Sequence, residues 1–217
     1  SQDGKAKLWE LNGKCIRTLE NNMIFVNSVV FSPDGKYILT GSWNEKAQLW
    51  DLNGKLIKEF IGHNNAWNET ASVTSVAFSI NGKYVYTASM DNSVRMWDLR
   101  GNSVSKFIGH DSGVTSIRPS SDGKSIISAS YDGTIRLWNL KSVPIHEYSH
   151  NGSVSSIAFS PTKKYIATAS WDSTVVLWNV NGKKVKTIKN HSDYVSSVAF
   201  SNDGNQTLSG SWDGTAI

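Results

Sequence analysis

The sequence predicts an all-β fold built from repeated four-stranded antiparallel sheets. A segment that ends in Trp recurs at a spacing of about 41 residues, with one longer interval. Each period contains four short runs rich in Val, Ile, Thr and aromatic residues, separated by turn pairs such as Asn-Gly and Asp-Gly. No stretch has helical periodicity. Because one such sheet cannot bury both of its faces, we expect neighbouring sheets to pack against each other.

The length and composition favour one globular domain over residues 1–217, with both ends falling within a repeat. The chain is 39% hydrophobic, which is enough for a sizeable core, and its 18% charged residues are fewer than coiled coils carry. The single cysteine, Cys15, excludes an internal disulfide and a Cys-based metal site. A reducing compartment is expected, the cytoplasm or alternatively the nucleus. No apolar run is long enough to span a membrane.

Each period has the same order of elements. A first strand begins with Val and is followed by a turn of the Asp-Gly-Lys type, and a third strand ends with the repeated Trp. Six residues before that Trp stands Asp or Asn, with Ser two residues further upstream. The expected first strands are residues 26–32, 73–79, 114–120, 154–160 and 195–201. The third strands end at Trp9, Trp50, Trp97, Trp138 and Trp178.

These motifs resemble WD repeats. The third strands end in Trp-Asp at residues 50–51 and 97–98 and in Trp-Asn at 138–139 and 178–179, and Gly-His pairs stand at 62–63 and 109–110. The pattern recurs in every period and covers the whole chain. The resemblance implies a β-propeller of four-stranded blades, usually seven, that acts as a rigid platform for protein–protein assembly.

The resemblance also implies buried hydrogen-bonded tetrads of His, Ser, Asp and Trp. Residue by residue, the expected sets are His63, Ser89, Asp91, Trp97; His110, Ser130, Asp132, Trp138; and His150, Ser170, Asp172, Trp178. A fourth set contains His191, Ser211 and Asp213 without its Trp. The blade of Trp50 has Asn44 in place of Asp and Glu20-Asn21-Asn22 in place of Gly-His. We therefore expect that blade to lack a tetrad and to be less stable.

Two features leave alternatives open. Residues 211–217 repeat the pattern of residues 1–7 at an offset of 210. The chain is thus a fragment of a seven-bladed propeller, which we favour, or a closed five-bladed ring.

Pro119 stands where other first strands have Phe, so its strand is expected to be weakened or bulged. Arg118 precedes Pro119, at a position where other repeats have Ala. We expect its side chain either to line the channel in contact with solvent or to make a functional contact.

The residue types of a hydrolase triad do not predict an enzyme here. Ser, His and Asp recur in every complete period at the same register, whereas a nucleophile site is built once. The sequence contains no phosphate-binding loop, dinucleotide motif or metal-ligand cluster. We expect a stabilising network, no catalysis, no cofactor, no metal and no small-molecule substrate.

Candidate binding residues stand between the Ser and Asp of each repeat, in the turn joining the second and third strands. In WD-repeat proteins this turn opens on the top face of the propeller. Large side chains are unusual in turns and typical of interface anchors. The expected surface contains Trp43, Met90, Tyr131, Trp171 and Trp212, together with Phe25, Trp67 and Tyr194. The alternative is that each ring packs over a neighbouring sheet and closes the core.

The sequence therefore predicts a scaffold that binds a peptide or loop of a protein partner on this aromatic face. Arg118, or a nearby Lys, would contact an acidic group of the partner. One alternative is a sequence-independent nucleic-acid platform, which a pI near 9.1 makes conceivable. The basic residues favour strands and outer turns, which disfavours nucleic acid. Another alternative is a structural or sensor propeller within a larger multidomain protein.

Overall fold

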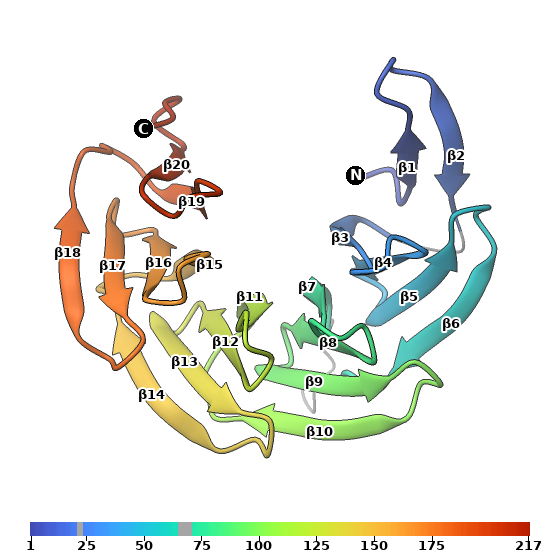
Figure 1. The fold of residues 1–217 in the computed structure, drawn as a ribbon, viewed down its shortest axis with the longest axis horizontal. Helices are drawn as coiled ribbons and strands as arrows, with labels where there is room; N and C mark the ends of the chain where they lie inside the picture. Colours follow the sequence, from blue (N-terminus) through green and yellow to red (C-terminus); the bar gives the residue numbers. More distant parts are fainter. Residues whose placement is uncertain (21–23, 65–70) are drawn as a thin grey trace. The chain divides into compact units, whose positions relative to one another are not determined.

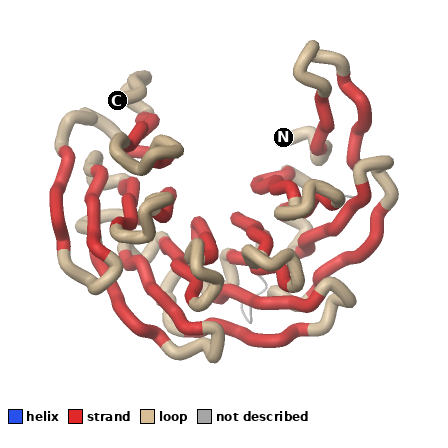
Figure 2. Tube along the Cα trace, in the orientation of Figure 1, coloured by secondary structure: helices blue, strands red, loops and turns tan. Residues whose placement is uncertain are grey.

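A computed structural model describes residues 1–20, 24–64 and 71–217, which form β-strands joined by turns and loops (Figures 1 and 2). Within this part of the chain there is no helix of the length and apolarity that a membrane span requires. The chain divides into two compact units, unit 1 over Ser1–Lys106 and unit 2 over Phe107–Ile217. The predicted all-β fold of repeated four-stranded antiparallel sheets is confirmed.

Unit 1 contains a two-stranded sheet and a four-stranded sheet, and it contributes most of a second four-stranded sheet, whose last strand crosses its boundary. Strands neighbouring in sequence pair with each other, so each sheet is a meander. The strands are β1 (Ala6–Trp9) and β2 (Cys15–Leu19); β3 (Val26–Phe31), β4 (Tyr37–Ser42), β5 (Lys46–Asp51) and β6 (Leu56–Ile61); and β7 (Val73–Phe78), β8 (Tyr84–Ser89), β9 (Ser93–Asp98) and β10 (Ser103–Ile108).

Unit 2 repeats this arrangement with two four-stranded sheets and one two-stranded sheet. The predicted first strands begin at the expected valines in both units. The strands of unit 2 are β11 (Val114–Pro119), β12 (Ser125–Ser130), β13 (Thr134–Asn139) and β14 (Pro144–Ser149); β15 (Val154–Phe159), β16 (Tyr165–Ser170), β17 (Val175–Asn179) and β18 (Lys184–Ile188); and β19 (Val195–Phe200) and β20 (Thr207–Ser211).

The residue after each repeated Trp closes the turn between the third and fourth strands. Asp98 Oδ1 accepts hydrogen bonds from the backbone N–H groups of Arg100 and Asn102, both at 2.9 Å. Asn139 Oδ1 accepts the equivalent bonds from Lys141 and Val143. Since only an acceptor oxygen is needed, Asp and Asn are interchangeable here. This explains why some repeats end in Trp-Asp and others in Trp-Asn.

In unit 2, a β-bulge near the start of each four-stranded sheet connects that sheet to the next one. In β11 the register with β12 shifts between Val114 and Ser116, which leaves Thr115 as the extra residue. A bulge redirects the side chain of the extra residue. Thr115 Oγ1 accordingly donates to Val154 O in β15 at 2.6 Å. Ser155 donates to Val195 O at 2.5 Å in the same way, so each bulge supplies a polar contact between sheets of unit 2.

Apolar side chains fill the space between neighbouring sheets. In unit 2, Ile135 and Leu137 of β13 and Tyr148 of β14 pack with Ile157 of β15 and Trp178 of β17 in one buried cluster. In unit 1, sheet β3–β6 packs against β7 so closely that a Cβ on Gly41 would lie 2.8 Å from side-chain atoms of Val73 and Val76. The core therefore lies between sheets, as the repeat requires.

Pro119 does not bulge its strand, so that part of the expectation is wrong, whereas a weakening of the strand stays a prediction. β11 extends through Pro119, which pairs with Ile126, and the bulge of this strand lies at its opposite end, as in every other first strand. Pro119 is the last residue of β11, and β11 is an edge strand of its sheet. Pro is tolerated at such positions because its missing N–H removes little of the ladder.

We predict that the hydroxyls of the bulge residues contribute measurably to the free energy of unfolding. Thr115→Val keeps the shape of the side chain and removes the bond to Val154 O, so unfolding in urea should show a loss of about 1–2 kcal/mol. Thr18→Val, at an exposed position of β2, is the control and should change stability by less than about 0.5 kcal/mol. Equal effects of the two substitutions would contradict a role for the bulge contact.

Candidate functional site

A chain of hydrogen bonds runs through the sheet β11–β14. His110 Nδ1 lies 2.9 Å from Asp132 Oδ2, and His110 Nε2 lies 2.8 Å from Ser128 Oγ. The indole N–H of Trp138 donates to the same Ser128 hydroxyl at 2.8 Å. Ser128 is fully buried at 0% exposure, and the ring of Phe107 packs against Trp138. The network thus joins strands β12 and β13 to the loop before β11 through side chains inside the core.

The structure brings together the predicted His, Asp and Trp of each complete set but corrects the hydroxyl. The bridging residues are Thr87, Ser128 and Thr168, each two residues before the predicted serine, and Ser209 takes this place in the set without Trp. The predicted serines, Ser89, Ser130, Ser170 and Ser211, instead donate to carbonyl oxygens in the loop before the first strand. The prediction was wrong because side chains two residues apart lie on the same face of a strand, and only the strand register distinguishes them.

The Asp of each network holds two loops at one end of its sheet. Asp132 Oδ1 accepts bonds from the backbone and the hydroxyl of Thr134, both at 2.7 Å, within the β12–β13 turn. Asp132 Oδ2 also accepts the backbone N–H of Asp111 at 2.9 Å, in the loop before β11. The buried network therefore fixes the conformation of the turn that carries Tyr131.

The sheet β3–β6 retains part of this arrangement. Trp50 Nε1 donates to Thr40 Oγ1 at 3.0 Å, as the other tryptophans do to their hydroxyls. Asn44 stands at the position of Asp. Two residues of the segment expected at the histidine position, Asn21 and Asn22, lie outside the described residues.

The electrostatics of the network favour an ionised carboxylate beside a neutral imidazole. Burial lowers the pKa of His63 and of His150, and the hydrogen bonds that they donate to their Asp partners, together with the negative charge of these partners, only partly oppose this effect. Burial disfavours ionisation of Asp91, but hydrogen bonds from His63 and Ser93 outweigh it and lower the pKa of Asp91 to about 2. Each such pair consequently carries one negative charge at neutral pH.

The order Asp132–His110–Ser128 has the connectivity of a catalytic triad, but its geometry serves packing. The Ser128 hydroxyl is enclosed and already accepts the indole N–H of Trp138, so a substrate carbonyl has no approach to it. The same connectivity recurs in neighbouring sheets with Thr in place of Ser. Within the described ranges, no group of three or more His, Cys, Asp or Glu side chains is arranged to hold a metal ion.

The predicted binding residues stand in turns whose backbone is anchored. The amide of Tyr131 donates to Gly113 O at 3.0 Å, that of Trp171 to Ser153 O at 2.9 Å, and that of Trp212 to Tyr194 O at 2.9 Å. Each bond ties the turn between the second and third strands to the loop before the first strand. With the backbone held in this way, the side chain projects from the end of the sheet and stays partly exposed.

In unit 2 four of these side chains form a continuous row. Tyr131 contacts Trp171 with ring centroids 5.5 Å apart, Trp171 stacks on Tyr194 at 5.0 Å and 15°, and Tyr194 contacts Trp212 at 5.8 Å. We call Tyr131, Trp171, Tyr194 and Trp212 the aromatic row. Their exposed fractions are 37%, 38%, 39% and 69%. The rings pack edge to face, stacked or tilted across three sheets, and all four remain partly exposed.

In unit 1 the predicted residues form a smaller group. Phe25 and Trp43 make an edge-to-face contact at 4.7 Å, and Trp43 is 47% exposed. The backbone of Phe25 has a positive φ of 45°. Met90 occupies the equivalent turn after β8 and is 36% exposed. Trp67 lies outside the described residues.

The structure does not bring Arg118 together with the aromatic row. Tyr131 follows Ser130, which pairs with Val114 at one end of β11, whereas Arg118 lies four residues along the strand and pairs with Ile127. Four residues of strand correspond to about 13 Å. Arg118 is exposed, and its guanidinium donates to Ile117 O at 2.7 Å. Arg118 therefore lies away from the aromatic turns, and its contact with an acidic group of a partner stays a prediction.

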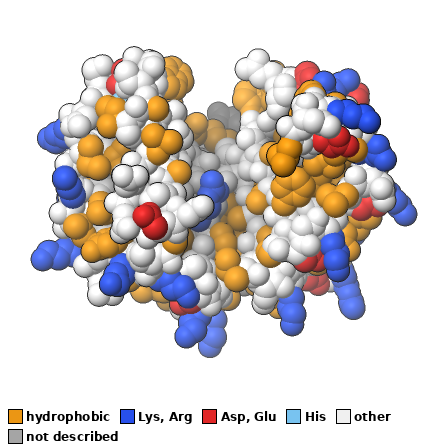
Figure 3. All heavy atoms as spheres, turned by 45° about the horizontal axis from the view of Figure 1, so that its top comes forward, with side chains coloured by type: hydrophobic (Ala, Val, Ile, Leu, Met, Phe, Trp, Pro, Cys, Tyr) orange, Lys and Arg blue, Asp and Glu red, His pale blue; other side chains and the backbone are white. Residues whose placement is uncertain are grey.

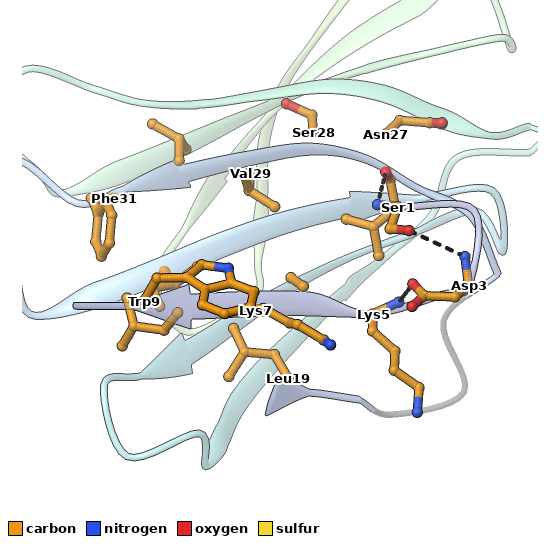
Figure 4. Close-up of a pocket in the computed structure, with 15 residues that line it drawn as sticks. Ser1, Asp3, Lys5, Lys7, Trp9, Leu19, Asn27, Ser28, Val29 and Phe31 are labelled. Carbon is orange, nitrogen blue, oxygen red and sulfur yellow. Dashed lines mark hydrogen bonds between the residues drawn. The ribbon is translucent and has the colours of Figure 1, made fainter. Parts of the chain in front are cut away.

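A second exposed apolar area lies in unit 1 between β1 and β3. A groove of about 750 Å³ is bordered by Trp9, Leu19, Val29 and Phe31 (Figure 4). Among the described strands β1 pairs only with β2, so its other edge is open and the apolar side chains beside it are exposed. The groove thus reflects the edge of a two-stranded sheet rather than a set of convergent polar groups.

Sequence reasoning missed the bridging hydroxyls and the bulge residues. Both groups leave a pattern in the sequence. Thr or Ser stands ten residues before each buried Trp, and the Val that begins each first strand is followed by Asn, Ser or Thr. These signals are weaker than the invariant serine before the turn, because Ser and Thr are frequent in strands as such.

The bridging hydroxyl predicts a large loss of stability on its removal. Ser128→Ala leaves the indole N–H of Trp138 and His110 Nε2 without their buried partner, so urea unfolding should show a loss of about 2–3 kcal/mol. Ser103→Ala, at an exposed position of β10, should cost less than about 0.5 kcal/mol. A similar small cost for both would show that the network contributes little.

The buried histidines predict a loss of stability on acidification. Below the ordinary histidine pKa of 6.5 the unfolded chain binds protons that His63 and His150 resist, because burial lowers their pKa. Stability should therefore decline as the pH falls below 6.5. It should decline further below the ordinary Asp pKa of 3.8, as the pH approaches the pKa of Asp91, about 2. Urea unfolding across this range measures both declines.

The control for this pH dependence is the double variant His63→Gln, His150→Gln. It lacks two of the groups whose protonation is suppressed, so the difference between its stability at neutral pH and its stability just above the Asp range should be smaller than in the unchanged protein. A stability that stays constant between neutral pH and that range in the unchanged protein would contradict the neutral state of the buried imidazoles.

Comparisons with known proteins agree with the geometry. Residues 72–217 match the family model described as the IFT122 first beta-propeller, and residues 13–51 match the model described as WD domain, G-beta repeat. Nuclear distribution protein nudF 2 of Penicillium rubens is 43% identical over 42 residues, which are 19% of this chain and 9% of the fungal protein. Domains of this kind are interaction scaffolds and are typically not catalytic. The matches and the repeated four-stranded sheets show that the chain belongs to the WD40-repeat β-propeller family.

Proposed function

We propose that the chain is a protein-interaction scaffold that binds a peptide or loop of a partner on its aromatic turns, with the aromatic row of unit 2 as the main contact. The observation that carries this proposal is the continuous row of four partly exposed rings, in contact through Trp171 and Tyr194. Contiguous exposed aromatic surface is uncommon on monomeric proteins and typical of interface anchors. Figure 3 shows apolar side chains exposed on one face of the molecule.

The arrangement supports binding because the row is rigid before a partner arrives. The turn backbones are bonded to neighbouring loops, and the rings hold one another at fixed angles. Little side-chain freedom is then lost on association, which raises the affinity obtained from a given contact area. Tyr and Trp also combine a large apolar area with a polar group that can select hydrogen-bonding partners.

Some side chains of the row also pack between sheets. Trp171 contacts both Tyr131 and Tyr194, so it contributes to cohesion between sheets as well as to the exposed surface. Trp212 lies at the end of the row, contacts Tyr194, and is the most exposed of the four. Trp212 is therefore the position where binding and stability are most easily separated.

The test is the double variant Trp171→Ala, Trp212→Ala, compared with the unchanged chain in affinity capture of partners and in thermal unfolding. We expect loss of the captured partners with a decrease in Tm of only a few degrees, because both side chains are partly exposed. Trp212→Ala alone should reduce capture with still less effect on Tm. The control is Ile145→Ala, an exposed apolar position of β14 in the same unit, which should keep all partners.

Retention of every partner by the double variant, together with a large drop in Tm, would contradict the proposal. It would assign the rings to closure of the sheet ends and leave binding to another surface.

A further inference from the structure

The loops and turns that carry the aromatic row contain acidic residues and no basic ones. The loops before β11, β15 and β19 and the turns after β12, β16 and β20 form the end of the sheets that carries the row. None of the described residues in 110–113, 130–133, 150–153, 170–173, 191–194 and 211–214 is Lys or Arg. The same segments contain Asp111, Asp132, Asp172, Asp193 and Asp213.

The lysines of unit 2 stand mainly at the other end of the same strands. Lys124, Lys141, Lys163 and Lys183 lie in the turns after β11, β13, β15 and β17, which alternate with the aromatic turns along each antiparallel meander. The exceptions are Lys189, which directly follows the outer strand β18 and is exposed, and Lys184, whose side chain lines a pocket together with Lys189, His150 and Asp172. The excess of basic over acidic residues in the chain therefore lies mainly outside the loops and turns that carry the row.

The carboxylates near the row are not neutralised by the histidines beside them. Burial lowers the pKa of His150, which keeps its imidazole uncharged at neutral pH. Hydrogen bonds from Thr174 and His150 keep the pKa of Asp172 low in spite of its partial burial. Asp111 and Asp193 are exposed, and Asp193 directly precedes Tyr194 of the row. The loops and turns that carry the row thus hold net negative charge.

We infer that the partner segment bound at the aromatic row is basic and places an arginine side chain against its rings. This inference rests on the proposed function and adds the chemistry of the partner. Aromatic faces attract cations, and a planar guanidinium stacks on an indole or phenol ring while its edge donates to carboxylates such as those of Asp111 and Asp193. An acidic peptide or a nucleic acid would instead be repelled by this end of unit 2.

The first test pans a library of short random peptides against the 217-residue chain and against its Trp171→Ala, Trp212→Ala variant. We expect the peptides enriched only on the unchanged chain to be rich in Arg. Enriched peptides without basic residues would overturn the inference of a basic partner and leave the row as a binding surface. If no peptide distinguished the two proteins, both this inference and the proposed function would fail.

The second test measures binding of fluorescein-labelled peptides of alternating Arg and Gly, Lys and Gly, or Glu and Gly by anisotropy. We expect the Arg peptide to bind most tightly and the Glu peptide not at all. Asp111→Asn, Asp193→Asn should weaken the Arg peptide at least about threefold, because it removes two charges beside the row. The control, Asp122→Asn, Asp203→Asn, removes two charges from turns at the opposite strand ends and should have a smaller effect.

Two outcomes of the second test would overturn the inference. One is an equal effect of the two double variants, which would show that the Arg peptide responds to overall charge alone. The other is binding of a labelled thymidine oligonucleotide that is lost in Trp171→Ala, Trp212→Ala, since it would show that the row accepts an anionic chain.

Discussion

The hydrogen bonds that end at the buried Thr or Ser hydroxyl are the constraint on which the rest of the structure depends. The hydroxyl of Ser128 accepts the indole N–H of Trp138 and lies within hydrogen-bond distance of His110, so no polar group of these side chains is left buried without a partner. Because His110 also contacts Asp132, the network extends from the core to the turn at the end of the sheet. The same interaction that stabilises the interior therefore sets the conformation of the exposed turn.

Apart from Trp9 at the end of β1, the described tryptophans fall into two groups with different roles. Trp50, Trp97, Trp138 and Trp178 are buried and donate their indole N–H to a hydroxyl within the sheet. Trp43, Trp171 and Trp212 stand in turns and are partly exposed. A repeat that contains one Trp for packing and one large side chain for contact can build a core and a recognition surface from the same period. In unit 2 successive sheets bring these turns into ring contact, which a single sheet could not do.

Much of this fold could be predicted from sequence, and the failures have physical causes. The strands were predictable because Val, Thr and aromatic residues alternate with Gly turns, and the pairing of His110 with Asp132 followed from the resemblance. The hydroxyl partner of Trp138 could not be predicted, because Ser128 and Ser130 lie on the same face of β12 and only the register with Trp138 distinguishes them. The distance of Arg118 from Tyr131 was not predictable for a related reason, since it depends on which end of β11 carries the turn. Ring contacts such as Trp171 with Tyr194 depend on how sheets stack, which local sequence does not specify.

Hydrogen exchange of the indole N–H groups, followed by NMR, tests the central claim most directly. The account predicts that the indoles of Trp97, Trp138 and Trp178 exchange only when their sheets unfold, because each donates to a buried hydroxyl. The indoles of Trp171 and Trp212 should exchange rapidly. Protection of Trp171 and Trp212 as strong as that of Trp138 would contradict the account, since the aromatic turns would then belong to the core.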